Sequence, residues 1–216
     1  MIEDIQNFIS REDAACQLID VLPIDKMQEE NWLVLATSVG SVPIAKKVSE
    51  VLNADFDYLF THKVFTSKNK ECEIAIITET GEIVIHEELM KSFSLKLDDI
   101  YQEINKNHLD KLSSYQEKYR NSSEIIDLTN KNILLVDEGL NTGLTMMACI
   151  KSVISSGAKS ICVAVPILPE VTINDIGMIA DDLYYVKAPA HFVSIDFYYD
   201  NLEDINLEEI LKLKGK

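Results

Sequence analysis

The chain has 216 residues, of which 47% are hydrophobic and 26% charged, and its formal net charge is −16 at pH 7. These proportions are close to those of globular proteins, so they exclude a disordered chain, a collagen-like repeat and a disulfide-rich scaffold. An anionic chain is repelled by phosphates, which argues against nucleic acid or anionic lipid as its main partner.

No apolar run approaches the ~20 residues that a membrane-spanning helix needs. Residues 1–13 are acidic and have no long apolar stretch, so they do not match a secretory signal. We therefore expect a cytoplasmic protein. The four cysteines form no CxxC pair and the four histidines show no metal-ligand spacing, so the sequence predicts neither disulfides nor a zinc site.

The first half of the chain alternates between helical and strand-like patterns. Ser10 and Asp13 resemble a capping box at the start of a helix. The polar segment 61–72 predicts a loop, and the apolar spacing over 97–119 predicts a long amphipathic helix. The other predicted elements are a strand over 32–36, a helix over 43–52, a strand over 56–60 and a hairpin of strands 73–77 and 82–85.

The second half continues the alternation. Its predicted elements are a strand over 132–136, a helix ending near 155, a strand over 161–165, a helix over 173–180 and a strand over 183–186. Uninterrupted apolar strands are typical of parallel sheets buried on both faces. Strands separated by helices form right-handed βαβ units. The sequence thus predicts an α/β fold with a largely parallel twisted sheet and helices on both faces.

The segment 133–146 carries the strongest functional signal. Its buried strand delivers two carboxylates, Asp137 and Glu138, to the end where open α/β sheets bind ligands. A short loop, 139–143, then leads into a helix N-terminus, whose unpaired N–H groups favour an anion. Thr142 and Thr145 add hydroxyl donors. A phosphate on the loop, beside carboxylates that accept from sugar hydroxyls, describes a ribose 5-phosphate site.

This segment resembles the motif with which type I phosphoribosyltransferases bind phosphoribosyl pyrophosphate (PRPP): four apolar residues, two acids and a Thr-Gly-x-Thr loop. Segments 35–45, 62–81, 164–166 and 192–200 resemble a bacterial subgroup of that family. The resemblance implies one domain over 1–216, with a core of about 30–187. It also implies a flexible β-hairpin arm, a small C-terminal hood formed by the N-terminal helix and about 188–216, a Mg²⁺ cofactor and a homodimer.

The resemblance also assigns roles to the acids and the loop. Asp137 and Glu138 are the expected catalytic pair, which would bind the ribose hydroxyls and hold Mg²⁺ mostly through those hydroxyls and water. The simpler interpretations are an acidic cluster that serves the helix dipole and an ordinary turn between strand and helix. The residues expected to hold the 5-phosphate are Gly139, Leu140, Asn141, Thr142, Gly143, Leu144 and Thr145.

The loop expected to bind pyrophosphate departs from the pattern of the subgroup. The subgroup has an Arg and two glycines there, whereas this chain has Val39, Gly40 and Ser41. The lost cation would weaken pyrophosphate binding by about 1.5–3 kcal/mol. Lys63 matches a lysine of the subgroup and is expected to supply charge. The neighbouring basic residues are His62, Lys68 and Lys70.

The acceptor base is expected under the hood, with Phe192 and Tyr198 as stacking candidates and Asp200 as a polar contact. Phe197 and Tyr199 are further aromatic candidates, although aromatic runs also form cores and dimer contacts.

The favoured function is Mg²⁺-dependent transfer of a phosphoribosyl group from PRPP to a nitrogenous base, with release of pyrophosphate. The alternatives are a catalytically weak sensor of PRPP or a nucleotide, favoured by the missing Arg, and another phosphate-handling enzyme on the same loop.

Overall fold

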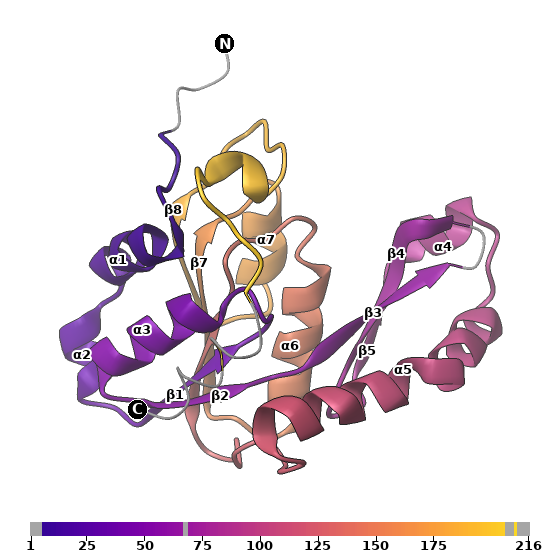
Figure 1. Ribbon diagram of the computed structural model, residues 1–216, viewed down its shortest axis with the longest axis horizontal. Helices are drawn as coiled ribbons and strands as arrows, with labels where there is room; N and C mark the ends of the chain where they lie inside the picture. The colour runs from indigo at the N-terminus through magenta and orange to yellow at the C-terminus, as the bar shows by residue number, and fades with distance from the viewer. Residues whose placement is uncertain (1–5, 67–68, 206–209, 211–216) are drawn as a thin grey trace.

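A parallel sheet forms the centre of the molecule in the computed structural model, which describes residues 6–66, 69–205 and 210, without the side chains of 69–71 and 105–110 (Figure 1). The sheet has five strands in the order β2-β1-β6-β7-β8, and every neighbouring pair is parallel. The strands are β1 (Trp32–Ala36), β2 (Asp55–Tyr58), β6 (Asn132–Val136), β7 (Ser160–Ile167) and β8 (Asp182–Lys187). The predicted parallel sheet is confirmed.

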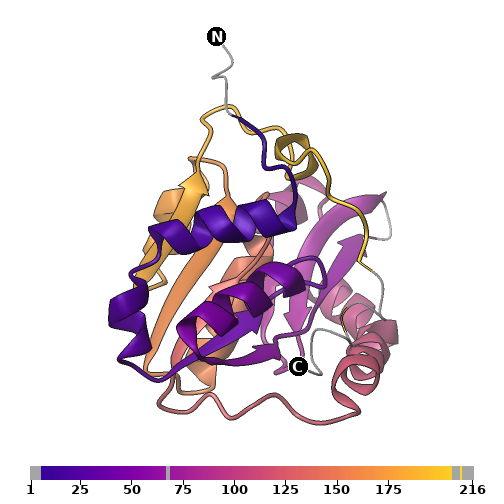
Figure 2. The ribbon, with the colours of Figure 1, turned by 60° about the vertical axis from the view of Figure 1, so that its left-hand side comes forward.

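Helices cover both faces of this sheet because its inner strands present buried apolar side chains to both sides. In β1, Val34 and Ala36 pack into one core and Leu33 and Leu35 into the other, as the two-residue repeat of a strand requires. The helices α1 (Arg11–Val21), α2 (Ile24–Gln28) and α3 (Val42–Leu52) contribute to the first core. The helices α6 (Leu144–Ser155) and α7 (Thr172–Gly177) contribute to the second. Figure 2 shows α1 and α3 side by side in front of the sheet.

The predicted Ser10 cap forms at the start of α1, but the reciprocal bond to the Asp13 side chain comes from Ile9 rather than from Ser10. The Ser10 hydroxyl accepts a hydrogen bond from the Asp13 backbone N–H, and Asp13 Oδ2 accepts one from the Ile9 backbone N–H at 2.9 Å. These two bonds satisfy backbone donors that have no partner within the helix.

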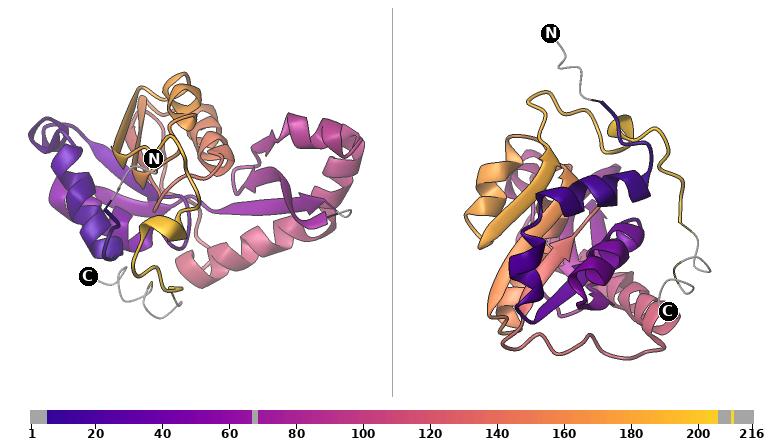
Figure 3. Two further views of the ribbon diagram at one scale, coloured as in Figure 1. Left: turned by 90° about the horizontal axis from the view of Figure 1, so that it is seen from above. Right: turned by 90° about the vertical axis from the view of Figure 1, so that its left-hand side faces the viewer.

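An arm projects sideways from the sheet (Figures 1 and 3). It consists of the antiparallel strands β3 (Thr61–Thr66), β4 (Asn69–Thr78) and β5 (Ile83–Ile85), followed by α4 (Glu87–Ser92) and α5 (Leu97–Arg120). The prediction of a loop over 61–72 is wrong, because β3 and the start of β4 lie there. In β3, buried Val64 and Thr66 alternate with exposed Lys63 and Phe65, so the strand has no continuous apolar run. The arm is therefore a three-stranded sheet rather than a hairpin.

A buried ion network ties the arm to the parallel sheet. Arg120, at the end of α5, pairs with Glu79, which follows β4, and its Nη1 lies 3.8 Å from Asp57 Oδ2 in β2. The side chains of all three residues are at most 6% exposed. The guanidinium also lies over the Phe60 ring, 4.7 Å from its centroid. Charges that are removed from water need such partners.

The segment before α1 meets the segment that follows β8 beyond the carboxyl ends of the parallel strands. The Phe8 backbone N–H donates to Tyr198 O and the Asp200 N–H donates to Phe8 O, both at 2.8 Å. Figure 2 shows these two segments side by side. In the described part of the chain, no helix combines the length and the apolarity needed to span a membrane.

Candidate functional site

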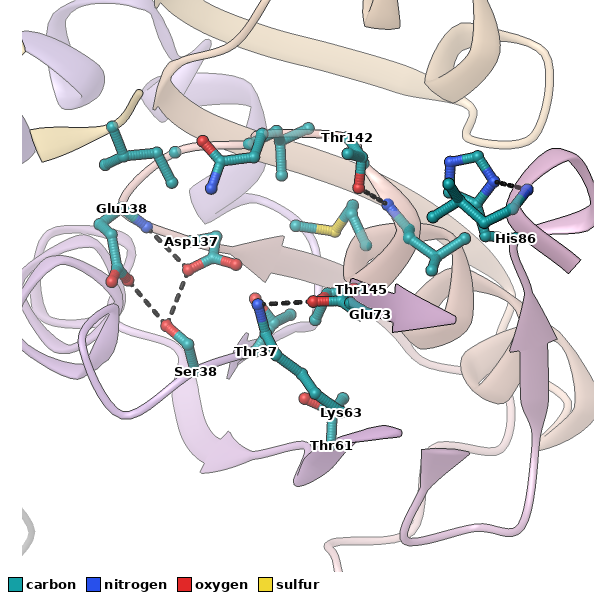
Figure 4. A pocket seen from close by; sticks show the side chains of 18 of the residues that line it. Thr37, Ser38, Thr61, Lys63, Glu73, His86, Asp137, Glu138, Thr142 and Thr145 are labelled. Carbon is teal, nitrogen blue, oxygen red and sulfur yellow. Dashed lines mark hydrogen bonds and ion pairs between the residues drawn. The ribbon is translucent and has the colours of Figure 1, made fainter. Parts of the chain in front are cut away.

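A cavity of about 590 Å³ lies where β6 ends and α6 begins (Figure 4). One side is formed by residues 137–146, which include both predicted acids and the whole predicted phosphate loop. Thr37, Ser38 and Ile195 also line it. The arm supplies the remaining wall, which consists of Thr61, Lys63, Cys72, Glu73, His86 and Leu89.

The acid pair is held together by a residue of the β1–α3 loop. The Ser38 hydroxyl lies 2.7 Å from both Asp137 Oδ1 and Glu138 Oε2, as Figure 4 shows. Asp137 Oδ1 also accepts the Glu138 backbone N–H at 2.9 Å. Burial raises the pKa of Asp137 well above its usual value, and the nearby charge of Glu138 raises that pKa further. These effects favour a proton on Asp137 when the site is empty.

The backbone around the acids is tightly packed. A side chain at Gly40 would overlap the Glu138 carboxylate, and one at Gly139 would lie 2.8 Å from Ile167 Cγ2. The Tyr199 hydroxyl donates to the Glu138 carbonyl at 2.7 Å. The β1–α3 loop and the C-terminal segment thus both contact Glu138, directly after β6.

The loop after the acids has the backbone shape that an anion site needs. Gly143 has φ = 75°, a left-handed conformation in which a side chain is strained, and it directly precedes the twelve-residue helix α6. Asn141 and Thr142 are exposed, and the Thr142 hydroxyl accepts from the Leu144 N–H at 3.4 Å. The first N–H groups of α6 therefore lie at the cavity wall.

Gly143→Val should abolish phosphate binding at this loop, because its bulk blocks the close approach of an anion to the backbone. Gly157→Val is a matched control, since Gly157 has φ = 77° and lines no part of the cavity. Both variants should lose about 1–2 kcal/mol of stability from the same backbone strain. Only Gly143→Val should lose the heat of phosphate binding in calorimetry. Equal phosphate binding in both variants would contradict an anion site here.

The arm wall contributes an ion pair and a histidine that are not part of the sequence motif. Lys63 Nζ lies 2.8 Å from Glu73 Oε2, and His86 Nδ1 accepts the Leu89 N–H at 3.4 Å. Sequence reasoning found Lys63 but missed Glu73, His86 and Ser38. Ser38 could have been found from the rule that carboxyl ends of neighbouring parallel strands meet at one edge.

The remaining predicted residues lie outside this cavity. Val39 lines an adjoining pocket, and Ser41 is fully buried, where its hydroxyl donates to the Ser38 carbonyl at 2.9 Å. In the predicted hood, Phe192 stacks on Tyr198 and Asp200 accepts from the Asn7 side chain. Lys68 and the side chain of Lys70 lie outside the described residues.

A parallel sheet that presents paired acids and a helix-entry loop at the carboxyl ends of its strands defines an α/β fold with a candidate ligand site at that edge. The model of the phosphoribosyl transferase domain matches residues 9–183, and the chain belongs to this family.

Curated relatives agree with this assignment. Proteins from two strains of Mycobacterium tuberculosis, each named "Putative phosphoribosyl transferase", are 26% identical over 204 residues. The match covers 94% of this chain and 45% of each relative, so the chain spans about half the length of these curated relatives.

Two solved structures share the fold. A crystal structure of a protein from Thermus thermophilus has a TM-score of 0.77 at 22% identity, covering 96% of this chain and 97% of the other. A hypoxanthine phosphoribosyltransferase of Staphylococcus aureus has a TM-score of 0.50 at 12% identity, covering 88% and 80%. The predicted type I fold is confirmed.

Proposed function

We propose that this domain binds PRPP and transfers its phosphoribosyl group to a nitrogenous base, with release of pyrophosphate. The observation that carries this proposal is the placement of the Asp137–Glu138 pair and the loop 139–145 in one cavity, in a chain of this family. The reaction breaks the bond between ribose C1 and the pyrophosphate oxygen and forms a bond from C1 to the base nitrogen. The proton on that nitrogen leaves to solvent.

Each end of the sugar would have its own partner. The backbone N–H groups of 141–145 would bind the 5-phosphate at the start of α6. Asp137 and Glu138 would accept hydrogen bonds from the ribose 2- and 3-hydroxyls. Their negative charge would stabilise the positive charge that develops on the sugar as pyrophosphate leaves.

Asp137 and Glu138 could supply only part of the ligand shell of a Mg²⁺ ion. Two adjacent carboxylates are oxygen ligands of the kind that Mg²⁺ takes, and it commonly completes its shell with water and phosphate oxygens. Within the described residues there is no group of three or more His, Cys, Asp or Glu that could hold a metal. Asp137 and Glu138 would therefore hold the ion through water and ribose hydroxyls. When bound, Mg²⁺ would neutralise charge on the leaving pyrophosphate.

A second candidate is a protein that binds PRPP or a nucleotide without turning it over. It is favoured by the apolar Val39 in the loop expected to bind pyrophosphate, and by the pairing of Lys63 with Glu73. One experiment separates the two functions: calorimetric titration with PRPP and Mg²⁺, together with pyrophosphate release in the presence of a panel of purine, pyrimidine and pyridine bases. Release with any base supports the transferase, and binding without release supports the sensor. No binding of PRPP, and none of a nucleotide in a parallel titration, would overturn both.

Lys63→Ala should weaken PRPP binding about tenfold or more, because Lys63 lines the cavity and would supply the charge for pyrophosphate. Lys151→Ala is a matched control: Lys151 is 57% exposed and pairs with Glu82, while Lys63 is 55% exposed and pairs with Glu73. Val39→Arg should change PRPP affinity little if Lys63 already supplies this charge. Unchanged PRPP affinity in both Lys63→Ala and Val39→Arg, measured by calorimetry, would contradict the pyrophosphate assignment.

A further inference from the structure

A second pocket of about 330 Å³ adjoins the cavity and shares lining residues with it. We call it the aromatic pocket, because Tyr58, Phe60, Phe65 and Tyr115 line it together with Val39. These side chains come from β2, β3, α5 and two loops, so the parallel sheet and the arm build the pocket jointly.

The deep walls of the aromatic pocket are fixed by packing. The rings of Tyr58 and Phe60 stack with centroids 5.7 Å apart and planes 7° apart, and the Phe60 and Tyr115 centroids are 6.0 Å apart. Arg120 lies over the Phe60 ring, which places the buried ion network directly behind this wall. A ligand would therefore meet preformed aromatic walls, and ordering them would cost little on binding.

The outer part of the pocket is apolar and exposed. Val39 is 36% exposed and Phe65 is 37% exposed, whereas Tyr58 is 3% and Phe60 7% exposed. A flat apolar ligand would cover Val39 and Phe65 and remove their surface from water, which is the main source of favourable free energy in such sites.

The inner edge of the pocket is polar and shared with the cavity. Thr37, Ser38, Thr61 and Lys63 line both spaces. The edge therefore presents an ammonium group and hydroxyls, which suit a ring bearing carbonyl, carboxylate or ring-nitrogen acceptors. The volume is at the lower end of the range of small-molecule sites, so it admits one ring system with small substituents.

The aromatic residues of the predicted hood pack on one another. Phe192 and Phe197 both pack on Tyr198, whose hydroxyl donates to the His191 carbonyl. None of these three aromatic residues lines the cavity or the aromatic pocket.

We propose that the aromatic pocket binds a planar heteroaromatic ring of nucleobase size, with the polar edge of the ring at Thr37, Thr61 and Lys63. This site is distinct from the ribose 5-phosphate site and does not depend on the proposed transferase activity. Because Lys63 and Ser38 belong to both spaces, a ring bound here contacts the same side chains as a ligand in the cavity.

The test is calorimetric titration of the full chain with adenine and with nicotinate, each alone. Phe65→Ala removes an exposed wall of the pocket and should weaken the tighter of the two probes about tenfold. Tyr101→Ala is the control, since Tyr101 is an aromatic residue on α5 that is 46% exposed and lines neither space. Phe192→Ala tests whether the ring binds instead at the predicted hood. Circular dichroism and thermal melting confirm that each variant is folded.

An effect of Phe65→Ala with wild-type affinity in Tyr101→Ala and Phe192→Ala supports the proposal. Loss of affinity only in Phe192→Ala, or no binding of either probe, overturns it. The outcome is independent of the transferase proposal. Pyrophosphate release with unchanged ring affinity in Phe65→Ala would refute the aromatic pocket alone. Ring binding that depends on Phe65, without any PRPP binding, would refute the transferase alone.

Discussion

Replacing both site acids, as Asp137→Asn with Glu138→Gln, should weaken PRPP binding about a hundredfold or more and at the same time stabilise the empty protein at neutral pH. The loss of affinity follows from replacing both carboxyl acceptors of the ribose hydroxyls by amides, and a hydrogen bond to a charged acceptor contributes about 1.5–3 kcal/mol. Calorimetry with PRPP and Mg²⁺ measures this loss. An unchanged affinity would show that the ribose assignment is wrong.

The gain in stability follows from the raised pKa of Asp137. Burial and the charge of Glu138 favour the protonated acid in the folded state. Its contribution to stability is therefore fully present below the unfolded pKa of about 3.8 and is lost as pH rises through the raised folded value. The amide variant has no such loss, so its melting temperature should exceed that of the wild type increasingly as pH rises from 4 to 8.

Asp127 provides a control in which the pKa is shifted in the opposite direction. Its pKa is lowered, mainly by a hydrogen bond from the Thr129 backbone N–H, and it lies on the surface. Asp127→Asn should therefore lower the melting temperature slightly at neutral pH and leave PRPP binding unchanged. A melting temperature that falls in the double variant of the site acids would contradict the raised pKa of Asp137.

Arg120→Met should lower the free energy of unfolding by about 3–5 kcal/mol. The methionine replaces the aliphatic volume but leaves the carboxylates of Glu79 and Asp57 buried without their cation. Both carboxylates keep other donors: Phe60 N–H and Gln116 to Glu79, and Ile126 N–H to Asp57. Urea unfolding at pH 7 measures the loss.

Lys118→Met replaces a cation by methionine at an exposed position of α5, so it should change the free energy of unfolding little. Adding Glu79→Gln to Arg120→Met should recover part of the lost stability, because it removes one of the stranded charges. If Arg120→Met unfolds at the urea concentration of Lys118→Met, the network does not hold the arm to the sheet.

The parts of the structure that depend on local pattern were predictable from sequence. Residues 133–136 are apolar because β6 is buried on both faces, and Gly143 stands where the backbone needs a left-handed turn. The positions of the two acids and of the loop 139–145 could be predicted from these two features, because they lie between the end of β6 and the start of α6. They come together in one cavity because they are consecutive in the chain.

The parts that depend on contacts between distant segments were not predictable in this way. β3 pairs with β4 in the arm and exposes Lys63 and Phe65. Its sequence therefore has no continuous apolar run that would identify it as a strand. Ser38 reaches the acids across 99 and 100 residues of chain, and Arg120 reaches Glu79 across 41. No local periodicity encodes such contacts, so the aromatic pocket and the arm wall of the cavity emerge only in three dimensions.

The position of Ser38 has a consequence for the speed of binding. Its hydroxyl already makes, with Asp137 and Glu138, the contacts that hydroxyls of an incoming sugar would make. If the acids bind a sugar as proposed, its hydroxyls would replace that of Ser38, and we expect the β1–α3 loop to withdraw first. Association that waits for such an opening step reaches a limiting rate at high ligand concentration, set by the loop and independent of which sugar arrives.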